Sequence, residues 1–312
     1  MIEIFKIKEN GFDRLSEYEK DSWINVAAPD EGEIKTLVSK FDIPEDFLTD
    51  SLDANERARI EIEAGCMIII LRVPFLNDED ANIPFSTLPL GIILPKEGNH
   101  IITICCRNNK VLTDFITGKV RNLHLKNRVD FILKIFLRTT LLYLFDLQEI
   151  NKLTTDIEEE LHESIKNREL IELLNLEKSL VYFTTSLKSN DLMMMKLQKV
   201  KTVSLSEDER DTLEDIVIDN RQAIEMANIY SNILSGMMDA FASVISNNLN
   251  IVMKFLTSIS IILMIPTLIA SLYGMNVKLP FQAYPHAFIL TIILSLALCI
   301  GGVSFFIKRK WL

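Results

Sequence analysis

The chain has 312 residues and a formal net charge of -10 at pH 7, with 43 acidic and 33 basic side chains. The acidic excess argues against nucleic acid or an anionic lipid surface as the partner of the water-soluble part. It fits a protein that handles cations, although ordinary solubility explains the same charge. The length suffices for two domains and a membrane anchor.

Residues 1–127 predict an α/β domain in which helices alternate with strands to form an α/β/α sandwich. Helical stretches are expected at Glu31–Phe41 and Glu45–Leu52. The turn sequences Ala64-Gly65 and Lys96-Glu97-Gly98-Asn99 separate β-rich runs. The strand-like runs are Ile2–Lys8, Trp23–Val26, Ile60–Ile62, Met67–Val73, Gly91–Leu94 and His100–Cys106.

Residues 128–250 predict a helical bundle that ends in a long stalk helix. Glycine and proline are absent from this region until Gly236, and Leu, Ile, Glu and Lys recur with helical spacing. Ser206 and Glu209 form a capping box at the start of the last helix. No stop signal precedes the membrane, so this helix is predicted to be about 100 Å long and must pack on other helices. The expected helices cover about 129–165, 168–200 and 206–273.

Two apolar runs near the end of the chain predict membrane-spanning helices. The runs Phe255–Tyr273 and Ala287–Ile307 contain no charged residue. Each approaches or reaches the roughly 20 residues that cross a bilayer as a helix. The predicted segments are a first span over 251–275, a loop over 276–286, a second span over 287–307 and a basic tail over 308–312.

Basic residues predict the orientation of these spans in the cell membrane. Lys254 precedes the first span, and Lys308, Arg309 and Lys310 follow the second, whereas the loop holds the single basic residue Lys278. By the positive-inside rule both chain ends are cytoplasmic, and the basic residues beside the spans surround the inner mouth. The alternating start of the chain, which lacks a signal peptide pattern, agrees with a cytoplasmic N-terminus.

On a helical wheel, the first span and the helix that leads into it carry most of their polar side chains on one face. The opposite face is apolar, with Ile262, Ile265 and Ile269 among its members. Hydroxyl groups on the first face indicate either packing between helices or a water-lined path. A path requires a ring of subunits with this helix innermost, because two spans cannot enclose a channel. This face collects Ser235, Asp239, Ser246, Asn250, Leu256, Thr257, Ser260, Met264, Thr267 and Ser271.

Proline and glycine bear on the packing of the spans. Pro266 removes the hydrogen bond that the Ile262 carbonyl would accept, which either bends the helix or frees a carbonyl for ions. In the second span, Gly301 and Gly302 predict close contact between helices.

Sequence patterns typical of enzymes are missing from the chain. GxGxxG, GxxxxGK[ST], GxSxG and HExxH are all absent. The four histidines and four cysteines are scattered and suggest no metal cluster. We therefore expect neither catalysis nor an organic substrate.

The tetrapeptide Tyr273-Gly274-Met275-Asn276 lies at the outer end of the first span. This motif, together with two terminal spans and a short loop, resembles the CorA family of magnesium transporters. The segment Asn250–Thr257, the neck Met237–Phe241 and the basic end Lys308–Leu312 are also similar to that family. The resemblance covers about residues 235–312 and is specific because these features occur in combination.

The resemblance implies a funnel-shaped homopentamer with an α/β cytoplasmic domain, a helical stalk and one central pore. Gly274, Met275 and Asn276 would form the outer filter, where amide oxygens accept hydrogen bonds from water around Mg²⁺. The apolar pore residues would form a gate that closes by dewetting. From the outside inwards the pore would be lined by Ser271, Thr267, Met264, Ser260, Leu256, Met253, Asn250 and Asp239.

The family also carries a regulatory Mg²⁺ site between neighbouring cytoplasmic domains. The matching carboxylates here are Asp215 on the long helix and Asp50 after a short helix, with Asp53 as the alternative to Asp50. The other interpretation of Asp215 is a solvated surface acid. Bound Mg²⁺ would hold the ring shut, and its loss would leave like charges facing each other.

The identity of the ion stays open at this point. Many relatives have an acidic residue soon after the motif, whereas the loop here contains none. The transported ion is expected to be Mg²⁺, with Co²⁺, Ni²⁺ or Zn²⁺ as alternatives on the same scaffold. A two-span signalling receptor is the rival from another class, and oligomer mass would separate it from a pentameric channel.

Overall fold

The computed structural model describes most of the chain as two compact units, Met1–Gly236 and Met237–Leu312. Helix α6 contributes residues to both. The described residues are 1–8, 11–78, 82–120, 127–163, 167–200, 205–277, 280 and 285–311.

A mixed sheet forms the centre of the first unit. Its strands follow the order β2-β1-β3-β7-β6-β5-β4, in which β3 and β7 run parallel and the other neighbours are antiparallel. The central strands β5, β6 and β7 are almost continuously buried, as expected when both faces of a sheet are covered. The strands are β1 (Ile2–Lys8), β2 (Gly11–Leu15), β3 (Trp23–Ala27), β4 (Arg59–Glu63), β5 (Cys66–Leu76), β6 (Phe85–Leu94) and β7 (Ile101–Cys105).

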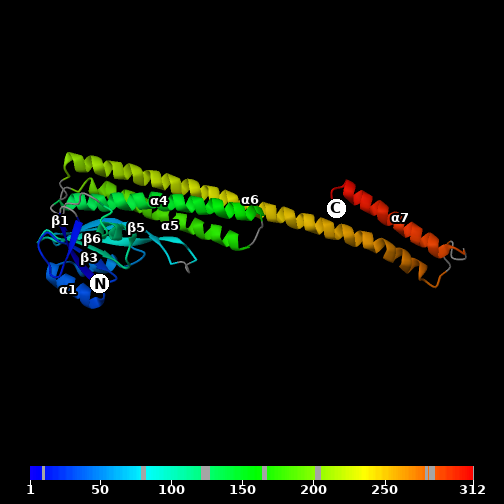
Figure 1. The fold of residues 1–312 in the computed structure, drawn as a ribbon, viewed down its shortest axis with the longest axis horizontal. Coiled ribbons are helices and arrows are strands. Elements are labelled where there is room, and N and C mark those ends of the chain that lie inside the picture. The colour runs from blue at the N-terminus through cyan, green and yellow to red at the C-terminus, as the bar shows by residue number, and fades with distance from the viewer. Residues whose placement is uncertain are drawn as a thin grey trace. The chain divides into compact units, whose positions relative to one another are not determined.

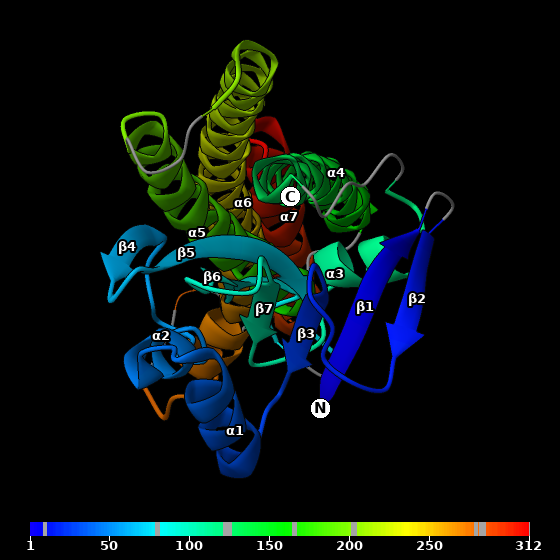
Figure 2. The same ribbon diagram turned by 90° about the vertical axis from the view of Figure 1, so that its left-hand side faces the viewer.

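Helices cover both faces of this sheet, so the predicted α/β/α sandwich is confirmed (Figure 2). One face packs against α1 (Glu31–Phe41) and α2 (Glu45–Asp50) through buried side chains such as Leu37 and Phe47. The other face packs against α3 (Lys110–Ile116) and the long helices, and its core includes Phe115. A capping box between Asp30 and Glu33 starts α1 at its predicted first residue.

The long helices of the first unit lie side by side (Figure 1). They are α4 (Arg128–Glu163), α5 (Asn167–Leu197) and the first part of α6 (Glu207–Tyr273). The predicted capping box begins α6: the Ser206 amide donates to Glu209 Oε2 at 2.8 Å, and the Glu209 amide donates to Ser206 Oγ at 3.3 Å. The helix then continues without interruption to Tyr273, as the lack of stop signals predicts.

The second unit holds the remainder of α6 and helix α7 (Ala287–Lys308). Both helices are long and apolar enough to cross a membrane, and the apolar windows of both are almost entirely exposed. Exposed leucines and isoleucines are expected of helices that lipid surrounds. The two predicted spans therefore exist as helices.

Two elements were missing from the sequence prediction. Strand β2 has no clear alternation and exists by pairing with β1, where Lys8 faces Gly11 and Ile4 faces Leu15. Helix α3 is only seven residues long and starts at the Asn109 cap, whose side chain accepts the Leu112 amide at 3.0 Å. Strand β6 also begins at Phe85, earlier than expected, because its pairing with β5 extends through two prolines.

Candidate functional site

Within the second unit, one face of α6 contacts α7. Ser258 is fully buried there, and a side chain added at Gly302 of α7 would meet Ile262 and Ile265 at 3.7 Å. Gly302 therefore faces α6 at an ordinary van der Waals distance that would also admit alanine, whereas a side chain at Gly301 would meet nothing within 4 Å in the described part of the chain. The α7 contact thus uses the face predicted to be apolar.

The predicted path residues of this part of α6 lie on exposed positions. Met253, Leu256 and Met264 are 53%, 56% and 67% exposed. Asn250, Ser260, Thr267 and Ser271 are exposed as well. Their spacing of three or four residues keeps them on one stripe of the helix. The structure brings these residues together on one face and leaves it unpartnered by α7.

Hydroxyl groups on the stripe are oriented by the helix itself. Ser260 Oγ donates to the Leu256 carbonyl at 2.9 Å, and Thr267 Oγ1 donates to the Leu263 carbonyl at 3.0 Å. Because each proton is used inside the helix, the oxygen lone pairs remain available outside it. Such a surface accepts hydrogen bonds, and it therefore suits the water molecules around a cation.

The carbonyl that Pro266 leaves without its helical partner does not belong to this stripe. Cys299 Sγ of α7 donates to the Ile262 carbonyl at 3.7 Å. Pro266 therefore releases an acceptor toward α7, where a thiol occupies it. Of the two roles predicted for this proline, the structure places the free carbonyl in the contact between the spans.

The Gly-Met-Asn motif follows the last turn of α6. The Gly274 amide donates to the Ala270 carbonyl at 2.9 Å, and the Met275 amide donates to the Leu272 carbonyl at 3.3 Å. A side chain at Gly274 would lie 3.2 Å from the Ala270 carbonyl oxygen, so glycine allows the tight end of the helix. Asn276 is exposed at the bend beyond it. Residues 278–279 and 281–284 of the loop, including Lys278, lie outside the described residues.

The remaining residues predicted near the inner mouth lie at the other end of the membrane segment. Asp239 is exposed on α6. The Lys254 carbonyl accepts from Ser258 Oγ at 2.7 Å, and Lys308 ends α7. Arg309 lies over the Phe305 ring at 5.8 Å, and Lys310 adopts a positive φ of 56°.

The predicted regulatory carboxylates differ in their surroundings. Asp50 ends α2, and its Oδ2 accepts from Arg59 Nη2 at 2.6 Å. Asp53 Oδ1 accepts the Asn55 amide at 2.9 Å. Asp215 is exposed on α6. Within the described part of one chain, no group of three or more histidine, cysteine or acidic side chains could hold a metal ion.

Two arginines near these carboxylates were not predicted. Arg59 contacts Glu56 at 3.4 Å and Glu61 at 3.1 Å in addition to Asp50, so three carboxylates share its one positive charge. Arg72 lies in the otherwise apolar strand β5. For Arg72, the signal available in the sequence was a single basic residue within an apolar run.

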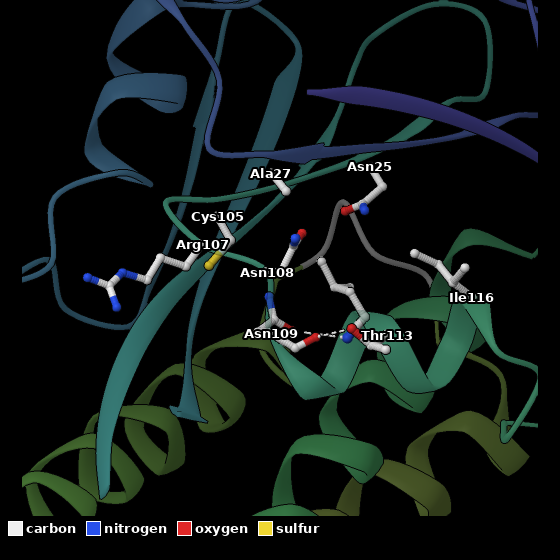
Figure 3. A pocket seen from close by; sticks show the side chains of 9 residues that line it. Asn25, Ala27, Cys105, Arg107, Asn108, Asn109, Thr113 and Ile116 are labelled. Carbon is white, nitrogen blue, oxygen red and sulfur yellow. Dashed lines mark hydrogen bonds between the residues drawn. The ribbon is translucent and has the colours of Figure 1, made fainter. Parts of the chain in front are cut away.

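A separate cleft lies at the carboxyl ends of the parallel strands β3 and β7 (Figure 3). It is small, with a cavity volume of about 20 Å³, and Asn25, Cys105, Arg107 and Asn109 are among its lining residues. A hydrogen bond from Cys105, and then the charges of Arg107 and Arg72, lower the pKa of the neighbouring Cys106 thiol to about 6. The lining contains no carboxylate, so the cleft offers no counter-charge to a metal ion.

The fold and the two apolar helices together define a class of protein: a two-span membrane protein with a large α/β unit. Residues 19–309 match the family of CorA-like Mg²⁺ transporter proteins. The chain belongs to this family.

Named relatives cover nearly the whole chain. The cobalt/magnesium transport protein CorA of Methanocaldococcus jannaschii is 28% identical over 93% of this chain and 91% of its own length. The magnesium transport protein CorA of Helicobacter pylori is 25% identical over 97% of this chain and 94% of its own length. The complete structure of the Methanocaldococcus jannaschii CorA magnesium transporter matches with a TM-score of 0.84 and 25% identity, covering 100% of this chain and 99% of that one.

Proposed function

We propose that this chain transports Mg²⁺ across the cell membrane through the central pore of a homopentamer, and that cytoplasmic Mg²⁺ closes the pore. The observation that carries the proposal is the exposed stripe of α6 from Asn250 to Ser271, whose Ser260 and Thr267 hydroxyls donate to carbonyls of their own helix and leave their oxygen lone pairs free to accept from water. Exposed hydroxyl and amide groups are unfavourable in lipid, since the hydrocarbon core contains no water to bond them. Copies of α6 around an axis would shield this stripe and keep it wet.

The proposed filter acts on the hydrated ion. A ring of Asn276 side chains, with Gly274 and Met275 shaping the turn, presents amide oxygens to the water shell. Mg²⁺ dehydrates reluctantly and usually retains several waters, so a ring that binds the shell selects it without removing that shell. Met253, Leu256 and Met264 narrow the path further in and can exclude water when the ring tightens.

The orientation and the domains follow from the same proposal. Lys254 and the basic tail place both chain ends in the cytoplasm by the positive-inside rule. Residues 1–127 form the cytoplasmic α/β domain, and residues 128–250 form the bundle and stalk. The membrane part then comprises the first span (251–275), the outer loop (276–286) and the second span (287–307), followed by the tail.

Regulation is assigned to carboxylates of neighbouring subunits. Asp215 of one chain would share a Mg²⁺ ion with Asp50 or Asp53 of the next, since carboxylate oxygens are preferred ligands of this ion. Arg59 already pairs with Asp50 within its own chain, which keeps Asp53 as the alternative. Loss of the ion would leave acidic side chains opposed and loosen the ring.

A second candidate is transport of Co²⁺ or Ni²⁺ by the same pore. The name of the Methanocaldococcus jannaschii relative, which includes cobalt, favours it. The loop that follows the motif carries no acid that would discriminate between the ions.

The test is ion flux into liposomes that contain the purified full-length protein. Asn276→Ala should abolish Mg²⁺ uptake and leave the pentamer mass unchanged. Asn248→Ala is the matched control, because Asn248 lies about 200° around α6 from Asn250 and off the stripe. Normal flux in the Asn276 variant would refute the filter, and a dimeric mass would refute the pore. Competition between Mg²⁺, Co²⁺, Ni²⁺ and Zn²⁺ then identifies the preferred ion.

A further inference from the structure

Arg72 holds the backbone of the acidic loop that follows α2. Its Nη1 donates to the carbonyl oxygens of Ala54 at 2.6 Å and Glu56 at 3.0 Å. Its Nη2 donates to the Thr87 carbonyl at 2.9 Å and the Thr87 hydroxyl at 2.6 Å. These four acceptors are neutral. The guanidinium therefore serves as a multidentate anchor for the loop, which carries Asp53.

Helix α5 binds the backbone of strand β5 at Arg72 through the side chain of Asn190. Asn190 is 1% exposed; its Oδ1 accepts the Arg72 amide at 2.9 Å, and its Nδ2 donates to the Arg72 carbonyl at 2.8 Å. This side chain thus makes both hydrogen bonds that a neighbouring strand would make. One residue earlier, Ser189 Oγ accepts the Ala58 amide at 3.0 Å, beyond the far end of the loop. Helix α5 is thereby hydrogen-bonded both to Arg72, which anchors the loop, and to Ala58, which follows the loop.

The same two turns of α5 also bind α6. Asn220 Nδ2 of α6 donates to the Leu187 carbonyl at 3.0 Å, and Asn220 is 1% exposed. Arg221 Nε donates to Asp191 Oδ1 at 3.0 Å. Asp191 directly follows Asn190, so two adjacent residues of α5 bind the sheet and α6, respectively.

We propose that Arg72 and Asn190 are positioning residues through which the acidic loop controls α6, with the Asp191–Arg221 ion pair as the last link. The inference rests on the proposed function, because it assigns the route by which a metal ion at Asp50 or Asp53 reaches the pore helix. A bound ion shifts the loop backbone, and Arg72 transfers that shift to β5 and Asn190. Helix α5 moves as a rigid element and displaces α6, which continues to Tyr273.

The experiment breaks the last link on the protein surface. Arg221→Asp in the full-length protein places two carboxylates opposite each other, and Mg²⁺ flux is measured in liposomes while internal Mg²⁺ is varied. The internal concentration that halves the flux should rise by about fivefold or more, since couplings between sites span that range. Uninhibited flux should not change. The double variant Asp191→Arg/Arg221→Asp should restore the wild-type value.

A second ion pair on α5 provides the matched control. Arg168 Nε and Glu172 Oε1 lie 2.8 Å apart near the start of α5, whereas Asn190 and Asp191 lie near its end. Glu172→Arg should leave the Mg²⁺ response unchanged. An unchanged response in Arg221→Asp, or a double variant no better than the single one, would overturn the inference.

Amide exchange separates this inference from the proposed function. If the wild-type flux does not respond to internal Mg²⁺, the proposed regulation is wrong. The amide exchange rates then test the coupling between α6 and the loop independently of flux. Arg221→Asp should accelerate exchange of the Ala58 and Arg72 amides, which Ser189 and Asn190 protect. Wild-type exchange at both amides would overturn the coupling. Asn190→Ala should show the same acceleration, and where that variant does not assemble, the exposed Arg221 variant decides.

Discussion

Gly302 and Gly301 make a direct test of the contact between the two membrane helices. Each is replaced by alanine and by leucine in separate variants. A Cβ at Gly302 would stand 3.7 Å from Ile262 Cγ1 and Ile265 Cδ1, which is ordinary van der Waals contact. A Cβ at Gly301 would meet nothing within 4 Å among the described residues. Two adjacent glycines therefore differ only in what lies opposite them.

The magnitudes follow from these distances. Alanine fits at both positions and should stabilise the helix by about 1 kcal/mol, because glycine is the poorer helix former. At Gly302 a leucine Cγ reaches about 1.5 Å beyond Cβ. That carbon would lie well inside the separation of about 3.5–4.0 Å at which carbon atoms attract best. Forcing the side chain into the contact should cost about 1–3 kcal/mol.

Thermal unfolding of the purified protein in detergent measures the difference. Gly302→Leu should lower the midpoint relative to Gly301→Leu by at least about 2–4 °C, the shift that accompanies 1 kcal/mol in a domain of 150–250 residues. Both alanine variants should unfold at or above the wild-type temperature. Equal midpoints for the two leucine variants would refute the assignment of Gly302 to the contact with α7.

Two further predictions concern the soluble unit and the gate. Burial raises the pKa of Asp146, which is 9% exposed, to about 6, with Lys110 opposing and Glu149 adding to the shift. The folded state therefore binds a proton that the unfolded state releases near pH 4, and stability falls as pH rises from about 4 through 6. Asp146→Asn should stabilise the protein by roughly 3 kcal/mol at pH 8 and not at all below pH 4, as urea unfolding at both pH values would show; equal effects at the two pH values would contradict the burial argument. Leu256→Asn should raise Mg²⁺ flux at high internal Mg²⁺, because a polar ring cannot dewet; flux that stays inhibited would remove Leu256 from the gate.

Local sequence patterns determined the elements of this protein whose stability depends on their own residues. The capping box at Ser206 and the lack of proline or a strong turn before the first span predicted the start of α6 and its continuation into the span. The uncharged runs predicted both apolar helices, and helical periodicity separated a face of α6 rich in hydroxyl groups from an apolar face. Helices and apolar faces repeat over a few residues, so short-range information is enough to find them.

Contacts between distant segments were decided only by the tertiary structure. Strand β2 exists because β1 pairs with it, and Gly302 rather than Gly301 faces α6 because of how α7 rotates in the contact. Arg59 pairs with Asp50, and Asn190 binds Arg72 across 118 positions of sequence. No local pattern specifies such partners, because they depend on which surfaces the folded chain brings together. The regulatory and pore residues remain predictions, since they require neighbouring copies of the chain.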